Sequence, residues 1–181
     1  MALPLINKTY LRSIFEVSIE TDVRIETRIE EAQIKDIKAV LGDALYWDFV
    51  NNITLAKYVL LLNGGTYTNK ENNAVEFAGV KKALAYYAYA RIIESDIQVT
   101  RYGAVQKKTD FSEPIPTTVI ARASAQNISM AVVYMNEVAS FLDKTKADYP
   151  LWQNCNTENV VNNTSYSKIS TITLKKHRLK Y

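Results

Sequence analysis

The sequence has 181 residues, of which 48% are hydrophobic, which is enough for one globular core with residues left over for peripheral extensions. Its 22 Lys and Arg residues nearly balance its 19 Asp and Glu residues, so overall charge favours neither a nucleic-acid-binding nor a membrane-binding class. The single cysteine, Cys155, excludes an internal disulfide and favours a reducing compartment such as the cytosol. No signal peptide is visible, nor any apolar run of the roughly 20 residues that a membrane span needs.

The first 20 residues are predicted to form an extended arm. Pro4 disfavours an early helix. Several β-branched and aromatic residues then favour a strand or an extended docked segment: Ile14, Phe15, Val17 and Ile19. We expect residues 1–20 to dock against an adjacent subunit.

A helical domain is predicted over residues 21–152. Its first helix is capped by Thr21 or Asp22 and ends or kinks at Gly42, with Glu31 and Lys35 spaced as a supportive pair. Apolar residues recur there at helical spacing: Ile25, Ile29, Ala32, Ile37, Leu41 and Leu45. Two short helices over 43–51 and 54–62 follow, and the breakers Asn63-Gly64-Gly65 introduce a polar loop at 66–73.

The next helix, Ala74 to Asp96, is dense in alanine and tyrosine, and its small residues allow a neighbouring helix to approach closely. Residues 97–116 leave the helical pattern and predict a strand or hairpin, with Pro114 and Pro116 keeping the end extended. Loops of this length are typical of binding, so we expect Thr100 to Lys108 to contact a neighbouring protein. The interface residues predicted there are Thr100, Arg101, Tyr102, Val105, Gln106 and Lys107.

The strongest pattern predicts a helix from Thr117 to Asp148, which would span roughly 48 Å. A lengthwise apolar seam has spacings of four and three: Ala121, Ala125, Ile128, Val132, Met135, Ala139 and Leu142. Polar residues occupy the other side: Arg122, Gln126, Ser129, Glu137, Ser140 and Asp143. The helix is therefore expected to be amphipathic.

Residues 153–181 are predicted to form a basic, β-prone extension. An Asn-rich linker leads to Tyr166–Leu174, whose β-branched content indicates a terminal strand that needs another edge to join. No acid appears after Glu158, whereas cations accumulate at Lys175, Lys176, Arg178 and Lys180. Three interpretations stay open: these residues contact a protein partner, they keep the surface soluble, or they bind phosphate groups of a nucleic acid.

Residues for catalysis or for metal binding are scarce. The lone histidine, His177, lies among cations near the end of the chain, and no histidine is placed to activate Cys155. One Cys and one His cannot build a zinc site, and no acidic cluster has calcium-loop spacing. Glu26, Glu30 and Glu31 lack the Glu-x-x-His partner of a di-iron bundle. We expect no enzymatic activity, no cofactor and no metal.

Two sets of residues resemble the head-tail connector, or adaptor, proteins of tailed bacteriophages. The first is Ala32-Gln33 with Ile37, Leu41-Gly42 and Leu45-Tyr46, which is similar to the opening helix pair of that family. The second is Tyr87-x-Tyr89-Ala90-Arg91, Thr100-Arg101-Tyr102-Gly103-x-Val105-Gln106-Lys107 and Ser112-Glu113, which resembles its helix, exposed loop and long final helix. The resemblance covers about residues 20–152, and residues from Gln153 onward fall outside it.

The resemblance implies a structural protein of the virion, at the head-tail junction, assembled in the host cytoplasm. It implies a ring of about twelve copies that joins the portal protein to the tail or to other ring proteins. Genomic DNA would pass through the channel without sequence-specific binding, and no membrane is involved. The expected fold is mainly α: a helical bundle with a long helix in its C-terminal half, a protruding loop or hairpin, and extended or β arms at both termini.

Overall fold

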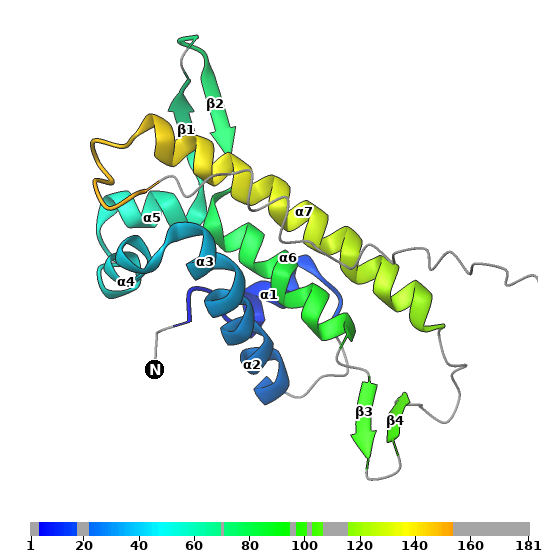
Figure 1. Cartoon of the computed structure of the whole chain (residues 1–181). Coiled ribbons are helices and arrows are strands. Elements are labelled where there is room, and N and C mark those ends of the chain that lie inside the picture. Colours follow the sequence, from blue (N-terminus) through cyan, green and yellow to red (C-terminus); the bar gives the residue numbers. More distant parts are fainter. Residues whose placement is uncertain are drawn as a thin grey trace, which may run out of the picture.

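The computed structural model describes residues 4–17, 22–69, 71–94, 97–100, 103–106 and 116–153 (Figure 1). These residues confirm the predicted fold class, because they are mainly helical, with a long helix in the C-terminal half and protruding hairpins. In chain order the elements are α1 (Lys8–Ile14), α2 (Asp22–Ala32), a π-helical segment η1 (Gln33–Ile37), α3 (Lys38–Leu41), α4 (Asp43–Asn51), α5 (Ala56–Asn63), β1 (Gly65–Thr68), β2 (Ala74–Phe77), α6 (Gly79–Glu94), β3 (Ile97–Thr100), β4 (Gly103–Gln106) and α7 (Thr117–Lys144).

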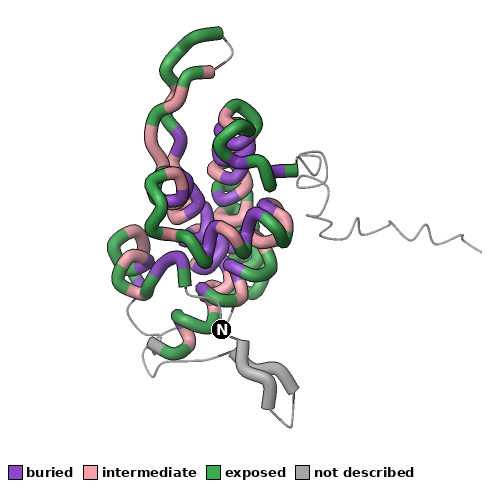
Figure 2. Tube along the Cα trace, turned by 90° about the vertical axis from the view of Figure 1, so that its left-hand side faces the viewer, coloured by how far each residue is buried: buried purple, intermediate pink, exposed green. Residues whose placement is uncertain are grey.

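The antiparallel helices α6 and α7 form the centre of the molecule and share its most extensive contact (Figure 1). Helices α2 and α5 pack against other parts of α6, so α6 is surrounded and its alanines are buried. Alanine has no side chain beyond Cβ, which lets neighbouring backbones come close. The predicted role of the small residues is confirmed by the near-zero exposure of Ala83, Ala85, Ala88 and Ala90. Figure 2 shows this buried interior against the exposed outer surfaces.

The first predicted helix is one continuous helix, α2–η1–α3, that ends at Gly42 as expected. Within it the Lys38 N–H donates to the Gln33 carbonyl, which is the i to i+5 bond of a π-turn. The Gln33 side chain is 1% exposed, accepts from the Leu5 N–H at 2.8 Å and donates to the Tyr46 hydroxyl at 2.9 Å. These bonds satisfy a buried amide that would otherwise be costly.

The predicted loop at 66–73 and the predicted helix start at Ala74 are wrong, because β1 and β2 form an antiparallel hairpin. Gly65 pairs with Phe77 and Thr68 with Ala74. A β-prone run, Thr-Tyr-Thr, supplies β1, and the buried Phe77 side chain stacks on Phe141 with ring centroids 4.2 Å apart. Helix α6 therefore begins only at Gly79, whose φ of 75° separates it from β2.

Part of the predicted N-terminal arm is helical and packs on its own chain. Asn7 caps α1, its Oδ1 accepting from the Tyr10 N–H at 2.8 Å. Phe15 stacks on Tyr89 with centroids 4.0 Å apart and planes 7° apart. Four aliphatic side chains of the segment join the core: Leu5, Ile6, Leu11 and Val17. These four side chains of residues 4–17 are thus buried within one subunit, and docking of residues 1–20 against an adjacent subunit stays a prediction.

Helix α7 begins after Pro116 as predicted and ends at Lys144, four residues before the predicted Asp148. Its seam is buried in the C-terminal half, but Ala121 and Ala125 are exposed and Ser124 is buried instead. The Ser124 hydroxyl donates to Glu94 Oε1 at 2.6 Å, so a hydrogen bond joins the N-terminal part of α7 to the C-terminal end of α6. The polar face is exposed apart from the half-buried Glu137, which accepts from the Ala78 N–H at 3.2 Å. Tyr166–Leu174 lies outside the described residues.

Candidate functional site

The predicted interface loop contains the β3–β4 hairpin, in which Ile97 pairs with Gln106 and Thr100 with Gly103. The backbone of Thr100, Val105 and Gln106 lies in this pairing, beyond the C-terminal end of α6 (Figure 1). The hairpin is therefore confirmed, and its role as an interface stays a prediction. Several other predicted site residues lie outside the described part of the chain: Arg101, Tyr102, Lys107, Lys175, Lys176, Arg178 and Lys180.

Helix α5 carries an apolar outer face that sequence analysis did not identify. Leu55 is 49% exposed, Val59 43% and Leu60 37%, while Tyr58 and Leu61 on the inner side of α5 are buried. The spacing of Leu55 and Val59 by four residues places them on one side of the helix. We call Leu55, Val59 and Leu60 the α5 face. The sequence does contain a signal for this face, because residues 54–62 are apolar on both sides of a helical projection.

A second exposed apolar surface lies on α7, on the side turned away from α6. Val119 is 52% exposed, Met130 41% and Val133 48%. We call these three residues the α7 face. Polar neighbours such as Gln126 interrupt it, which is why the sequence pattern indicated a solvated side here. Large aliphatic side chains exposed on two different helices are typical of surfaces that contact another protein.

A partly buried ion pair joins the two segments of the chain that carry the connector resemblance. Arg91 of α6 donates to the Asp36 carboxylate of η1 at 2.6 Å, with about a fifth to a quarter of each side chain exposed. Burial raises the pKa of Asp36 above its usual value, and the Arg91 charge opposes that shift. Burial also raises the pKa of the nearby Tyr87. The Arg91–Asp36 pair holds the α2–η1–α3 helix against α6, so we assign these residues a structural role.

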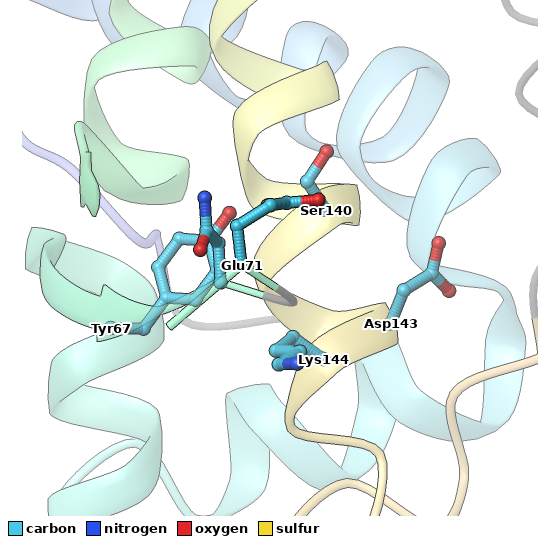
Figure 3. A pocket seen from close by; sticks show the side chains of 6 residues that line it. Tyr67, Glu71, Ser140, Asp143 and Lys144 are labelled. Atoms are coloured by element: carbon cyan, nitrogen blue, oxygen red, sulfur yellow. The ribbon is translucent and has the colours of Figure 1, made fainter. Parts of the chain in front are cut away.

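A polar pocket of about 260 Å³ lies between the β1–β2 hairpin and the end of α7 (Figure 3). Its lining includes Glu71 and Asp143 as acids and Lys144 as the cation. Asp143 already accepts from the Trp152 indole N–H at 2.8 Å, and Asn69 Oδ1 accepts from the Asn73 N–H at 2.9 Å. Its lining holds neither a nucleophile paired with a base nor a histidine.

Within the described ranges, no group of three His, Cys, Asp or Glu side chains is arranged to hold a metal ion. Across the same residues, no helix combines the length and apolarity needed to cross a membrane. His177 and Cys155, the two residues considered for catalysis, lie beyond the part that the structure describes.

No curated protein and no solved structure matches the chain. A family model does match it over residues 37–162, from the end of η1 through α7 and into the C-terminal extension. The match covers more than half of the sequence and includes both the α5 face and the α7 face. The chain belongs to this family, which is described as a family of unknown function (DUF6712).

Proposed function

We propose that the protein is a structural subunit of a virion, and that it forms a head-tail connector ring between portal and tail. One observation carries the proposal: a single domain exposes large apolar side chains on two different helices, α5 and α7. When two different surfaces of one subunit pair with each other, association is head-to-tail, and a suitable rotation closes it into a ring. The connector resemblance supports the proposal that this ring lies at the head-tail junction, and it implies a channel through which genomic DNA passes.

The projecting hairpins suit this role. In Figure 1 the β1–β2 hairpin extends from one end of the α6–α7 pair, and the β3–β4 hairpin lies beyond the other. Ring subunits need such extensions to contact components above and below, because the ring contacts themselves occupy the sides of the domain. We propose portal protein and a tail or second ring protein as the partners at these two ends.

The ring is tested by placing a charge on each face separately. We expect the wild-type chain to form rings in native mass spectrometry and electron microscopy, and to bind portal protein encoded in the same genome. Val59→Asp on the α5 face and Met130→Asp on the α7 face should each leave monomers, because an unpaired carboxylate is costly in a buried interface. Mixing the two variants should give dimers that grow no further, because each variant supplies the face that the other lacks.

The matched control is Asn72→Asp at the tip of the β1–β2 hairpin, where aspartate tolerates the φ of 64°. This variant carries the same added charge and should still form rings. A wild-type chain that stays monomeric at every concentration and never binds portal protein would contradict the proposal. Homodimers formed by either single variant would contradict head-to-tail pairing of the two faces.

A second candidate function is nucleic-acid binding through the basic tail, which the accumulation of cations after Glu158 favours. Phosphate contacts release counterions, so this function predicts DNA affinity that falls steeply with salt. Reversing the charges of Arg178 and Lys180 should then flatten the salt dependence. DNA binding that is weak and insensitive to this change would exclude it.

A further inference from the structure

A groove of about 340 Å³ runs between the N-terminal segment and helix α2. Its floor is apolar: Ile6 and Ile29 are 4% and 1% exposed, and Val23 at its edge is 71% exposed. Val23 thus adds exposed apolar surface beside the buried floor, and a partner that covered it would remove that surface from water. The groove is therefore shaped for an apolar side chain delivered by another segment.

The rim of the groove is acidic. Glu26 and Glu30 line it one helical turn apart, and the Glu26 side chain is 60% exposed. Lys8 Nζ lies 3.8 Å from Glu26 and offsets part of that charge. Arg28 of the same helix pairs with Glu31 at 2.8 Å. The occupant should therefore present cations on both sides of an apolar residue.

The C-terminal segment of this chain has that pattern. Its sequence Arg178-Leu179-Lys180 places one leucine between two cations, and no acid follows Glu158. In an extended segment, alternate residues lie about 6.6 Å apart. Residues one turn apart on a helix are separated by about 6 Å along its axis, so both cations can meet both acids at once. Alternate side chains of an extended segment point to opposite sides, so a leucine between two cations would enter the groove while the long cationic side chains bend over to the acids at its rim.

We propose that the groove binds the basic C-terminal segment 174–181, with Leu179 over Val23 and Ile29 and its flanking cations at Glu26 and Glu30. Gln153, the last described residue, precedes Arg178 by about 25 residues, which span up to roughly 80 Å when extended. This length reaches the groove of the same chain or that of a neighbouring copy. The N-terminal segment then forms one wall of a tail-binding site.

Disulfide trapping in the full chain tests the contact. With Cys155→Ser as background, Val23→Cys and Leu179→Cys are combined and oxidised, and the cross-linked fraction is followed on gels. The control combines Leu179→Cys with Trp47→Cys, at an exposed position on α4 (42% exposed) that lies outside the groove and outside the α5 and α7 faces. We expect cross-linking at Val23→Cys at least tenfold faster than at Trp47→Cys. The band size identifies the donor as the same chain or a second copy, and either supports occupancy of the groove.

Charge reversal tests the recognition. Glu26→Lys with Glu30→Lys should slow the cross-link tenfold or more, and adding Arg178→Glu with Lys180→Glu should restore it. Glu71→Lys with Glu76→Lys, on the β1–β2 hairpin, is the matched control and should change nothing. Equal cross-linking rates at the two cysteine positions would overturn the proposal. A cross-linking rate that is unchanged by Glu26→Lys with Glu30→Lys, in a chain whose tail binds DNA, would also overturn it. Ring formation through the α5 and α7 faces is assayed separately, so failure of the two proposals is distinguishable.

Discussion

The backbone crossing of Gly64 and Gly79 gives the sharpest prediction for stability. Gly64 ends α5 with φ 83° and ψ −179°, and Gly79 begins α6 with φ 75°. A Cβ atom on Gly64 would overlap the Phe77 carbonyl oxygen and lie 2.6 Å from the carbonyl carbon of Ala78. Both obstacles are backbone, which cannot turn aside as a flexible side chain can. Gly64→Ala must therefore separate the end of α5 from the start of α6.

The chain contains a matched control for backbone strain alone. Gly42 adopts φ 76° and ψ 157°, nearly the same conformation, but a Cβ there would meet nothing within 4 Å. Both alanine variants should lose about 1–3 kcal/mol, because this region of backbone conformation is nearly restricted to glycine. Gly64→Ala should lose roughly 2 kcal/mol more, the usual scale of forced overpacking. For a chain of this size, that difference lowers Tm by a further ~4–8 °C.

Thermal and urea unfolding followed by circular dichroism measure the difference, with both variants and wild type at one protomer concentration. Equal concentration matters because subunit association would itself shift Tm. Equal destabilisation of the two variants would refute the reasoning, since it would show that the crossing relaxes freely. A larger loss for Gly42→Ala would refute it more strongly.

Two further predictions concern tyrosine contacts. Burial, with a smaller effect from Asp148, raises the pKa of Tyr149 from 10.0 to about 12. The neutral Tyr149 side chain therefore contributes its full share to the free energy of unfolding below pH 10, and this share is lost as pH rises through 12. Tyr149→Phe should lower the free energy of unfolding by about 1 kcal/mol at neutral pH, because the hydroxyl donates to the Lys57 carbonyl at 2.6 Å. In urea titrations the variant should also lose less stability at alkaline pH than wild type does. An unchanged alkaline slope would contradict this. Phe15→Ala should cost about 2–3 kcal/mol by removing the stack on Tyr89, and should speed trypsin cleavage after Arg12 relative to wild type. Unchanged cleavage would show that the stack does not hold the segment.

The sequence predicted the helices whose signals are local. Asp43–Asn51 matched its predicted bounds, Gly42 ended the first helix, and Pro116 preceded the longest one. The β1–β2 hairpin was missed because its turn, Asn69 to Asn73, is polar and because Ala74 continues smoothly into an alanine-rich run. The stacking of Phe77 on Phe141, 64 residues further along, is a long-range contact that no local pattern reveals.

The candidate surfaces were less predictable than the fold. A hydrophobic residue on a helix is expected in the core, and Leu55 and Val59 became visible as a surface only once Tyr58 and Leu61 were seen to face inward. Ser124 displaced Ala121 and Ala125 from the α7 packing through its partner Glu94, which belongs to another helix. Pairings between distant segments decide both outcomes, whereas periodicity within one segment is all that a sequence pattern contains.

The π-turn at Gln33–Ile37 acts as a single-residue spacer. An α-helix turns by about 100° per residue, so positions spaced by four drift around the helix by about 40° at each step. The wider turn of η1 takes up part of this drift, and Ile29, Gln33, Ile37 and Leu41, each four residues from the next, all stay buried. One extra residue therefore lets a strict spacing of four keep one side of a long helix in the core.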